Sequence, residues 1–456
     1  MSPNLKRGFY QSSENIIMDN LSNSYPTGGI FDGGVCGVPP NGRNAHTHNG
    51  KNSATGSPLG IITELHVIGS GGDFEQNSPV SFDEKTLALV ERFSLQDIAC
   101  SILTQKEKRT SKDGSSYDTY VHRVNYCLKQ RVDATRSIFV RYNEKRQKAH
   151  YDNLQRCGSP WTCPFCAVQI TEGRRIEVKT AMDNYRKSGG YVYLVTFTNR
   201  HHVGDDLAEL LKGQQKAMTK LWQKTKVQNM VKCLGYEGRI TACEVTYGKN
   251  GWHPHYHVLM FFDHEINTDA LQSFMALEWQ IACGKVGMKL PTLEHGVDVQ
   301  KGDKADVYVA KWGLEHEMTK GHTKKGKEDG LTPFDLLRQS GDNPHYRKLF
   351  KQFADVFKGK QQLYWSNGLK SRLGVANRTD EELAEETEKE SIEIQEVATQ
   401  IWRLVLRYKL RSLYLRAVEQ DYLENSVNER VYNLIMPYAQ VEQDRLNALE
   451  RERLRE

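Results

Sequence analysis

The 456-residue chain lacks a long hydrophobic run. No apolar stretch approaches the roughly 18 residues that a membrane-spanning helix requires, and Met1–Arg7 leads into no apolar segment of the kind found in signal peptides. Hydrophobic residues make up 38% of the chain and charged residues 26%. These values predict a soluble, cytoplasmic protein with no membrane partner, long enough for about two or three domains.

The sequence also lacks the pattern G-x-x-x-x-G-K-[ST], which argues against a fused P-loop ATPase motor. Cysteine is scarce, with nine residues in the chain. At that density, and without a signal-like segment, we expect reduced thiols or metal ligands rather than a disulfide framework. Neither sign of charge dominates, because 62 Lys and Arg residues nearly balance 57 Asp and Glu residues and leave a net charge of +5. That balance permits a polyanionic partner without requiring one.

Shifts in composition divide the chain into four parts. Residues 1–80 are rich in Gly, Ser, Asn and Pro, which predicts a disordered, low-complexity segment. Residues 81–185 regain periodicity and include a cysteine-rich knuckle. Residues 186–375 carry strongly β-prone and helical segments, and residues 376–456 are charged and predicted to be helical.

The chain is organised around Gly251–Phe261, where two histidines precede an apolar run. His255 and His257 are two residues apart, so on a strand both imidazoles leave the same face and can hold one divalent metal. A third ligand is expected from the neighbouring strand. Glu244 is the first candidate and His253, which shares side-chain parity with the pair, is the second. The alternative is a pair of surface histidines before a core strand.

Strands and helices alternate around this segment. A strand is predicted at residues 191–199, a helix at about 205–232, and a second strand at 239–247. That second strand turns at 248–251 into the histidine strand, and another helix follows at about 268–283. This order predicts an α+β fold, with an antiparallel β-sheet and helices packed on one side.

A zinc knuckle is predicted upstream of the sheet. Cys163 and Cys166 form a C-x2-C pair, and Cys157 lies six residues before it. Thiolates at this spacing can converge on one tetrahedral Zn²⁺ that would be structural. Cys127 and His150 are both candidates for the fourth ligand. Three buried thiols without a metal, or a redox pair, are the alternative interpretations.

A tyrosine and a lysine share one face of a predicted helix at residues 305–313. The hydroxyl of Tyr308 can attack phosphorus if its proton is removed, and Lys311, one turn away, can offset phosphate charge. The alternative for Tyr308 is a buried aromatic residue. A basic stretch follows and is predicted to contact DNA phosphates; its lysines are Lys320, Lys324, Lys325 and Lys327.

Three ordered motifs resemble those of the HUH-endonuclease replication initiators of bacterial rolling-circle plasmids. They are Leu194–Asn199, then Glu244–Thr246 with His253–Leu259, and finally Tyr308–Trp312. The resemblance covers roughly residues 150–375 and implies that residues 186–375 form an HUH nuclease domain.

The resemblance implies that Tyr308 nicks one origin strand and becomes joined to its 5′ phosphate, while His255 and His257 bind Mg²⁺ or Mn²⁺. The freed 3′-OH would prime synthesis, with plasmid origin DNA, a host helicase and a DNA polymerase as expected partners. The motif departs from some relatives in having a single tyrosine, so Glu315 or Glu317 is a candidate for activating water at termination.

Two other interpretations remain open. A transposase or mobilisation relaxase would share the chemistry, although the lack of a fused helicase and the upstream knuckle favour a replication initiator. A zinc-containing DNA-binding regulator would leave Tyr308 and Lys311 unexplained, and it predicts origin binding without strand scission.

Overall fold

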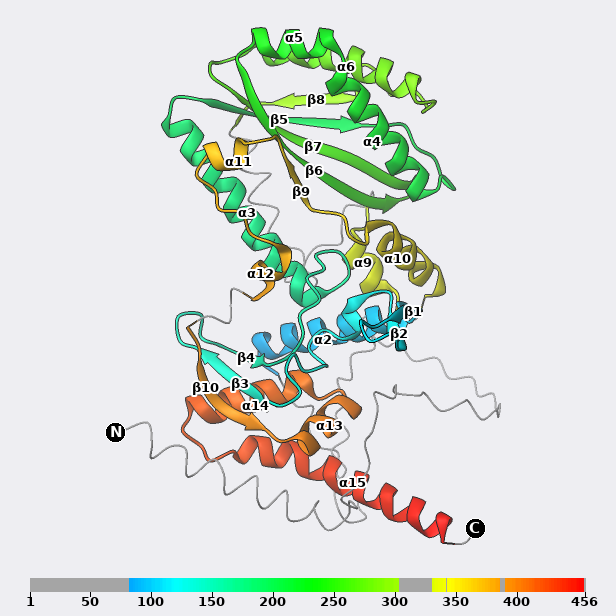
Figure 1. Cartoon of the computed structure of the whole chain (residues 1–456), viewed down its shortest axis with the longest axis vertical. Helices are drawn as coiled ribbons and strands as arrows, with labels where there is room; N and C mark the ends of the chain where they lie inside the picture. Colours follow the sequence, from blue (N-terminus) through cyan, green and yellow to red (C-terminus); the bar gives the residue numbers. More distant parts are fainter. Residues whose placement is uncertain (1–81, 303–329, 342, 386–389, 455–456) are drawn as a thin grey trace, which may run out of the picture. The chain divides into compact units, whose positions relative to one another are not determined.

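A computed structural model of the chain describes residues 82–302, 330–341, 343–385 and 390–454 (Figure 1). The chain divides into two compact units. The unit that we call the sheet unit consists of Leu95–Asn125 and Arg156–Thr387. The other, the terminal unit, contains Tyr126–Gln155, the chain from Glu388 onward and the residues up to Ser94. The division of the chain into four parts stays a prediction from the sequence. Within the described ranges, no helix is both long and apolar enough to cross a membrane.

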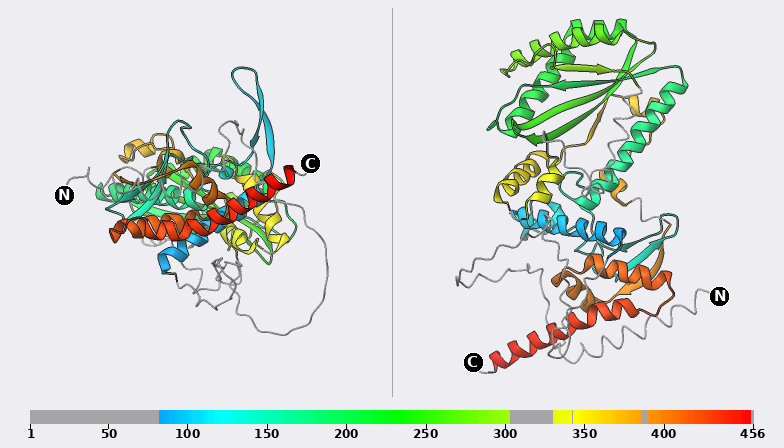
Figure 2. Two further views of the ribbon diagram at one scale, coloured as in Figure 1. Left: turned by 90° about the horizontal axis from the view of Figure 1, so that it is seen from below. Right: turned by 180° about the vertical axis from the view of Figure 1, so that it is seen from behind.

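The sheet unit is built on a five-stranded antiparallel sheet, seen from two sides in Figures 1 and 2. The order of the strands is β8-β5-β7-β6-β9. Their bounds are β5 (Tyr191–Thr198), β6 (Tyr236–Gly248), β7 (Gly251–Phe262), β8 (Val297–Gln300) and β9 (Leu363–Trp365). The two longest strands, β6 and β7, are therefore adjacent, and β5 and β7 lie in the interior of the sheet.

Side-chain alternation along β7 gives the sheet two apolar faces. Val258, Met260 and Phe262 point to one face, where they pack with residues of three helices. These helices are α4 (Leu207–Gln223), α5 (Thr225–Cys233) and α6 (Thr268–Lys285). Leu259 and Phe261 point to the opposite face.

The opposite face is covered by α3 (Pro164–Lys187), which contributes Val178, Ala181 and Met182 to the core there. The prediction that helices pack on one side of the sheet was therefore wrong. The apolar run of β7 has no polar alternation over its second half, so both of its faces need a cover. The α+β class with an antiparallel sheet is confirmed.

Shorter elements complete the sheet unit. A two-stranded hairpin is formed by β1 (Lys106–Thr110) and β2 (Ser116–Tyr120), followed by the 3-10 turn η1 (Arg123–Asn125). The remaining helices are α9 (Pro333–Gln339), α10 (Pro344–Phe357), α11 (Leu369–Arg372) and α12 (Asp380–Glu385). A reciprocal capping box between Thr332 and Asp335 begins α9.

The terminal unit contains a second antiparallel sheet, in the order β10-β3-β4. Its strands are β3 (Ile138–Asn143), β4 (Lys148–Asp152) and β10 (Ile392–Val397), and its helices are α13 (Thr399–Arg407), α14 (Arg411–Leu423) and α15 (Glu429–Arg453). The helix α2 (Glu84–Ile102) begins in this unit. The C-terminal region, predicted to be helical, thus also supplies a strand to the sheet.

Candidate metal centre and cysteine cluster

The hairpin of β6 and β7 places three ligand groups together. Glu244 on β6 is the direct cross-strand partner of His255 on β7. The Oε2 atom of Glu244 lies 3.4 Å from Nε2 of His255 and 3.0 Å from Nε2 of His257. The ligand atoms of all three residues lie within 4.8 Å of one another. Two imidazole nitrogens and one carboxylate oxygen fit a divalent cation such as Mn²⁺ or Mg²⁺.

The register of this hairpin depends on a tight turn. Lys249 and Asn250 form a two-residue turn between Gly248 and Gly251, which pair with each other. Gly251 has a φ of +85°, and a Cβ there would approach the backbone oxygen of His202 to 3.0 Å. Glycine therefore fits both the backbone conformation and the close approach at this position.

The electrostatics of the cluster favour the protonation states that bind metals. Burial opposes ionisation of the Glu244 carboxyl, but hydrogen bonds to His255 and His257 outweigh it and hold its pKa well below the ordinary value. Burial lowers the pKa of His257, against the hydrogen bond to Glu244, which raises it. An ionised carboxylate beside a neutral imidazole is the result.

A residue on the next strand, Thr196, holds the ring of His257, and it is not among the site residues predicted from the sequence. Thr196 on β5 is the cross-strand partner of His257, and its Oγ1 lies 3.0 Å from Nδ1 of that ring. A ring that binds metal through Nε2 carries its proton on Nδ1, and a neighbouring oxygen then fixes the orientation of the ring. In the sequence, Thr196 and Thr198 are two residues apart on the strand of the first motif, so their side chains share one face. Their pairing with the histidines follows only once the register of the sheet is known.

His253, the second candidate for the third ligand, lies beside the group rather than in it. Its ring stacks on that of His201, with centroids 4.6 Å apart. Burial lowers the pKa of His253 to about 4, and repulsion from His255 adds to this. Within the part of the chain that the structure describes, the metal-competent group contains Glu244 and not His253.

The predicted catalytic residues Tyr308 and Lys311 lie outside the described residues. The same holds for Glu315 and Glu317, and for the basic stretch with Lys320, Lys324, Lys325 and Lys327. The strand β8, which ends shortly before this segment, pairs with β5. The roles of these residues therefore stay predictions from the sequence.

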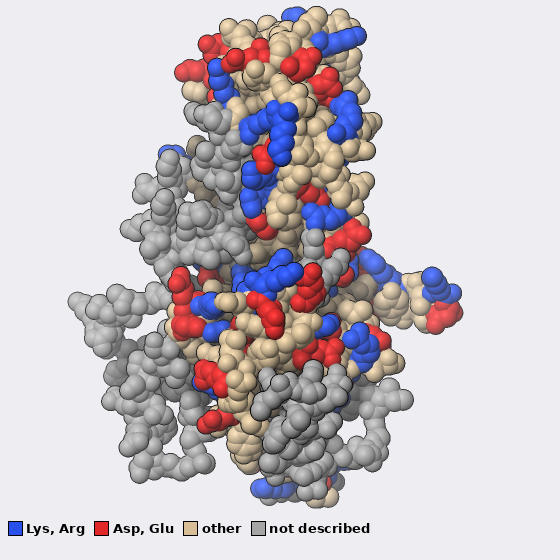
Figure 3. Space-filling model, turned by 90° about the vertical axis from the view of Figure 1, so that its left-hand side faces the viewer, with Lys and Arg blue, Asp and Glu red and all other residues tan. Residues whose placement is uncertain are grey.

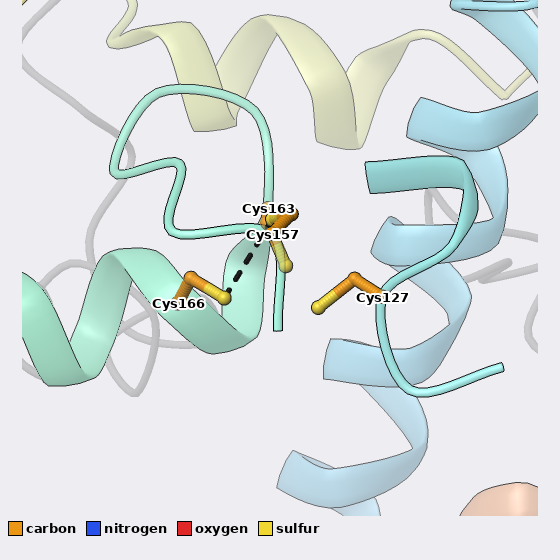
Figure 4. Close-up of side chains that lie close together, drawn as sticks. All are labelled: Cys127, Cys157, Cys163 and Cys166. Atoms are coloured by element: carbon orange, nitrogen blue, oxygen red, sulfur yellow. Dashed lines mark hydrogen bonds between the residues drawn. The ribbon is translucent and has the colours of Figure 1, made fainter. Parts of the chain in front are cut away.

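Three of the predicted zinc ligands lie together in the sheet unit (Figure 4). Cys163 is the N-cap residue of α3, Cys166 lies in the first turn of that helix, and Cys157 lies in the segment before it. The Sγ atoms of Cys157 and Cys166 are 3.6 Å apart, and all three sulfur atoms lie within 4.8 Å of one another. All three side chains are buried. Soft thiolates at these distances fit Zn²⁺.

The two candidates for the fourth zinc ligand, Cys127 and His150, both belong to the terminal unit. Within that unit, the N–H of Leu128 donates to the carbonyl oxygen of Gln155 at 2.9 Å. Cys127 directly precedes Leu128 in the chain. His150 instead lies on β4, with Nε2 3.3 Å from a serine hydroxyl of the terminal unit. The choice between Cys127 and His150 therefore stays a prediction from the sequence.

Charge at the surface does not by itself mark a binding face. On the face shown in Figure 3, Lys and Arg side chains are interspersed with Asp and Glu. The net charge of +5 is therefore not gathered into one uniform basic patch in that view. A contact surface for a polyanion has to be identified from individual side chains and their neighbours.

Comparisons with known proteins match a family model and curated relatives. A family model described as "Replication protein" (Rep_1) matches residues 148–415. Protein rep of Streptomyces lividans is 30% identical over 246 residues, which cover 41% of this chain and 54% of that protein. The neomycin resistance protein of Streptomyces cyanogenus is 33% identical over 132 residues, covering 24% of this chain and 30% of that protein. The chain thus spans about half the length, or less, of these curated relatives. No solved structure matches significantly.

Proposed function

Because the family model matches more than half of its length, the chain belongs to the replication protein family, and on that premise we propose that it initiates plasmid replication by nicking one DNA strand at the origin. The observation that carries the proposal is the convergence of Glu244, His255 and His257 within 4.8 Å on adjacent strands. Two imidazoles and a carboxylate in this arrangement are suited to a metal-dependent reaction on a phosphodiester.

The metal-binding residues have a defined part in this proposal. Glu244, His255 and His257 would hold Mg²⁺ or Mn²⁺, with Thr196 orienting the ring of His257. When bound, the cation would neutralise negative charge that develops on the scissile phosphate. An ionised Glu244 carboxylate and a neutral His257 imidazole with its proton on Nδ1 are the forms that would act as ligands.

The chemical step is assigned to Tyr308 by the sequence motif. Its hydroxyl oxygen would form a bond to phosphorus as the bond from phosphorus to the 3′ oxygen breaks. The tyrosine proton would go to a nearby base, and the 3′ oxygen would leave as a hydroxyl after taking up a proton. Lys311 would offset negative charge on the phosphate. The resulting phosphotyrosine ester conserves the energy of the broken phosphodiester bond, so religation needs no ATP. The free 3′-OH would prime a host DNA polymerase, while a host helicase unwinds the duplex.

A structural zinc site belongs to the same proposal. Cys157, Cys163 and Cys166 would supply three thiolates, and Cys127 and His150 stay the two predicted candidates for the fourth ligand. Four protein ligands leave no open position, so this zinc would stabilise the fold rather than take part in catalysis.

A covalent-adduct assay tests the proposed function. The full chain is incubated with a labelled supercoiled plasmid that carries its origin, with or without Mn²⁺, and protein–DNA adducts are resolved on denaturing gels. We expect a metal-dependent adduct that is lost in Tyr308→Phe and in His257→Ala. Tyr191→Phe, a change at an exposed tyrosine of β5, is the matched control and should nick normally.

Two outcomes would contradict the proposal. Nicking that persists in Tyr308→Phe would show that another residue is the nucleophile. Tight origin binding with no strand scission under any metal condition would instead favour a regulator that binds DNA without cutting it.

A further inference from the structure

The two strands that carry the metal ligands also contribute to a pocket on their other face. Tyr256 lies between His255 and His257 in sequence, so its side chain leaves β7 on the opposite side, toward α4. There a pocket of about 180 Å³ opens between α4, β6, β7 and the segment that leads into β9. Its lining includes Arg239, Thr241, Tyr256, Gln215, Lys360 and Tyr364.

The lining combines aromatic rings with cations. Tyr364, which is 47% exposed, and the partly buried Tyr256 both line the pocket. No Asp or Glu is among the described residues that line the pocket. Within the same described ranges, neither Arg239 nor Lys360 has a carboxylate ion-pair partner among the salt bridges of the chain. Aromatic faces beside uncompensated cations are the features that bind single-stranded nucleic acid.

The guanidinium of Arg239 and the backbone of Lys360 are held in place before any ligand arrives. The guanidinium of Arg239 lies 4.0 Å from the ring centroid of Trp222, and its Nη1 donates to the hydroxyl of Tyr236 at 3.2 Å. The backbone oxygen of Lys360 accepts a hydrogen bond from the indole N–H of Trp161 at 2.7 Å. Side chains that are already ordered lose less entropy on binding.

The pocket and the metal centre share one edge of the sheet. The short strand β9 pairs with β6 only at Ile240, Thr241 and Ala242. Cys243, which lines the pocket, and Glu244, which belongs to the metal centre, come directly after this paired stretch. The two sites are therefore on opposite faces of the same portion of β6, just past the end of β9.

We propose that this pocket binds one nucleobase of single-stranded DNA, stacked on Tyr364, with the neighbouring phosphates on Arg239 and Lys360. The inference rests on the proposed function, because it takes the DNA that is nicked as the ligand. A strand held here reaches the metal centre by passing over the edge of β6. The pocket would then anchor the strand on one face while the reaction proceeds on the other.

Binding of the full chain to fluorescently labelled oligothymidylate tests this inference. Anisotropy is measured over a series of salt concentrations without added Mg²⁺ or Mn²⁺, so the result does not depend on nicking. We expect Tyr364→Ala to raise Kd about 5-fold to 150-fold, because that is the range for losing one stacked base. Lys360→Gln should also weaken binding and should reduce the slope of log K against log salt by about 0.7.

The controls separate a local effect from a general one. Tyr191→Ala removes another exposed tyrosine of the same sheet, and Lys285→Gln removes an exposed lysine at the end of α6; neither should change Kd. Unchanged thermal unfolding of Tyr364→Ala shows that the variant is folded. The salt slope of Tyr364→Ala should equal that of the wild type, because the ring carries no charge.

The outcomes distinguish this inference from the proposed function. Wild-type affinity in both Tyr364→Ala and Lys360→Gln would overturn the nucleobase pocket while leaving the adduct assay unaffected. Failure of the wild type to bind single-stranded DNA at all would overturn both. Weaker binding in the pocket variants, with a metal-dependent adduct in the wild type, would support both.

Discussion

Replacing Thr196 by valine gives a sharp test of the metal centre. The substitution removes the hydroxyl that lies 3.0 Å from Nδ1 of His257 and keeps a β-branched side chain of similar shape. The other cross-strand neighbour of His257 is Ala242, which has no polar atom in its side chain to take over the role. Loss of an outer partner of a metal-binding histidine costs about 10-fold to 100-fold in metal affinity, or about 1.4 to 2.7 kcal/mol.

The fold should tolerate this change. A hydrogen bond of this kind contributes about 1 kcal/mol to stability, and valine is a strong β-former in the interior of a sheet. We therefore expect nearly unchanged thermal unfolding, together with a rise of about 10-fold to 100-fold in the Mn²⁺ concentration that half-saturates both calorimetric binding and adduct formation.

Thr198→Val is the matched control for this experiment. Thr198 lies two residues further along β5, on the same face, and is the cross-strand partner of His255. Among the described hydrogen bonds, none joins its side chain to that ring. An unshifted Mn²⁺ titration in Thr196→Val, or an equal shift in Thr198→Val, would refute the role given to the Thr196 hydroxyl.

Three further predictions follow from the same structure. Glu244→Ala should raise the Kd for Mn²⁺, measured by calorimetry, more than about 100-fold, because a direct ligand contributes more than a residue that only orients a ligand. His253→Ala should change this Kd far less. The reverse order would make His253 the third ligand. Cys166→Ser should lose zinc, measured by elemental analysis, and lower the thermal midpoint, whereas Cys233→Ser, at an exposed thiol, should do neither. Burial opposes ionisation of Glu278, but hydrogen bonds from two lysines hold its pKa below the ordinary 4.5. Its stabilising contribution is therefore complete above pH 4.5 and is lost as pH falls below it, so the difference in thermal midpoint between wild type and Glu278→Gln should shrink in acid.

The sequence was sufficient to predict the central part of the sheet unit. The strand predicted at residues 191–199 is Tyr191–Thr198, and the strand predicted at 239–247 lies within Tyr236–Gly248. The pairing of Glu244 with the two histidines was also predictable, because a tight turn fixes the register of a hairpin and alternation then fixes the faces.

The rest depends on contacts that local sequence does not encode. The strand β10 pairs with β3, so that Ile392 lies opposite Tyr142, and no periodicity within either segment specifies its distant partner. The strand β9 has only three residues, too few for an alternating pattern to be recognised. Nothing within the sequence of α3 specifies which face of the sheet this helix covers.

The β6–β7 hairpin has a consequence for how the metal centre is made. All three proposed ligands come from one hairpin closed by a two-residue turn, so bringing them together costs little loop entropy. Hairpins of this kind form within microseconds, well before distant strands find their partners. The ligand set is thus assembled by local folding and is stabilised afterwards by β5. Changes that loosen the terminal unit should therefore leave the intrinsic affinity of the proposed centre for its metal intact.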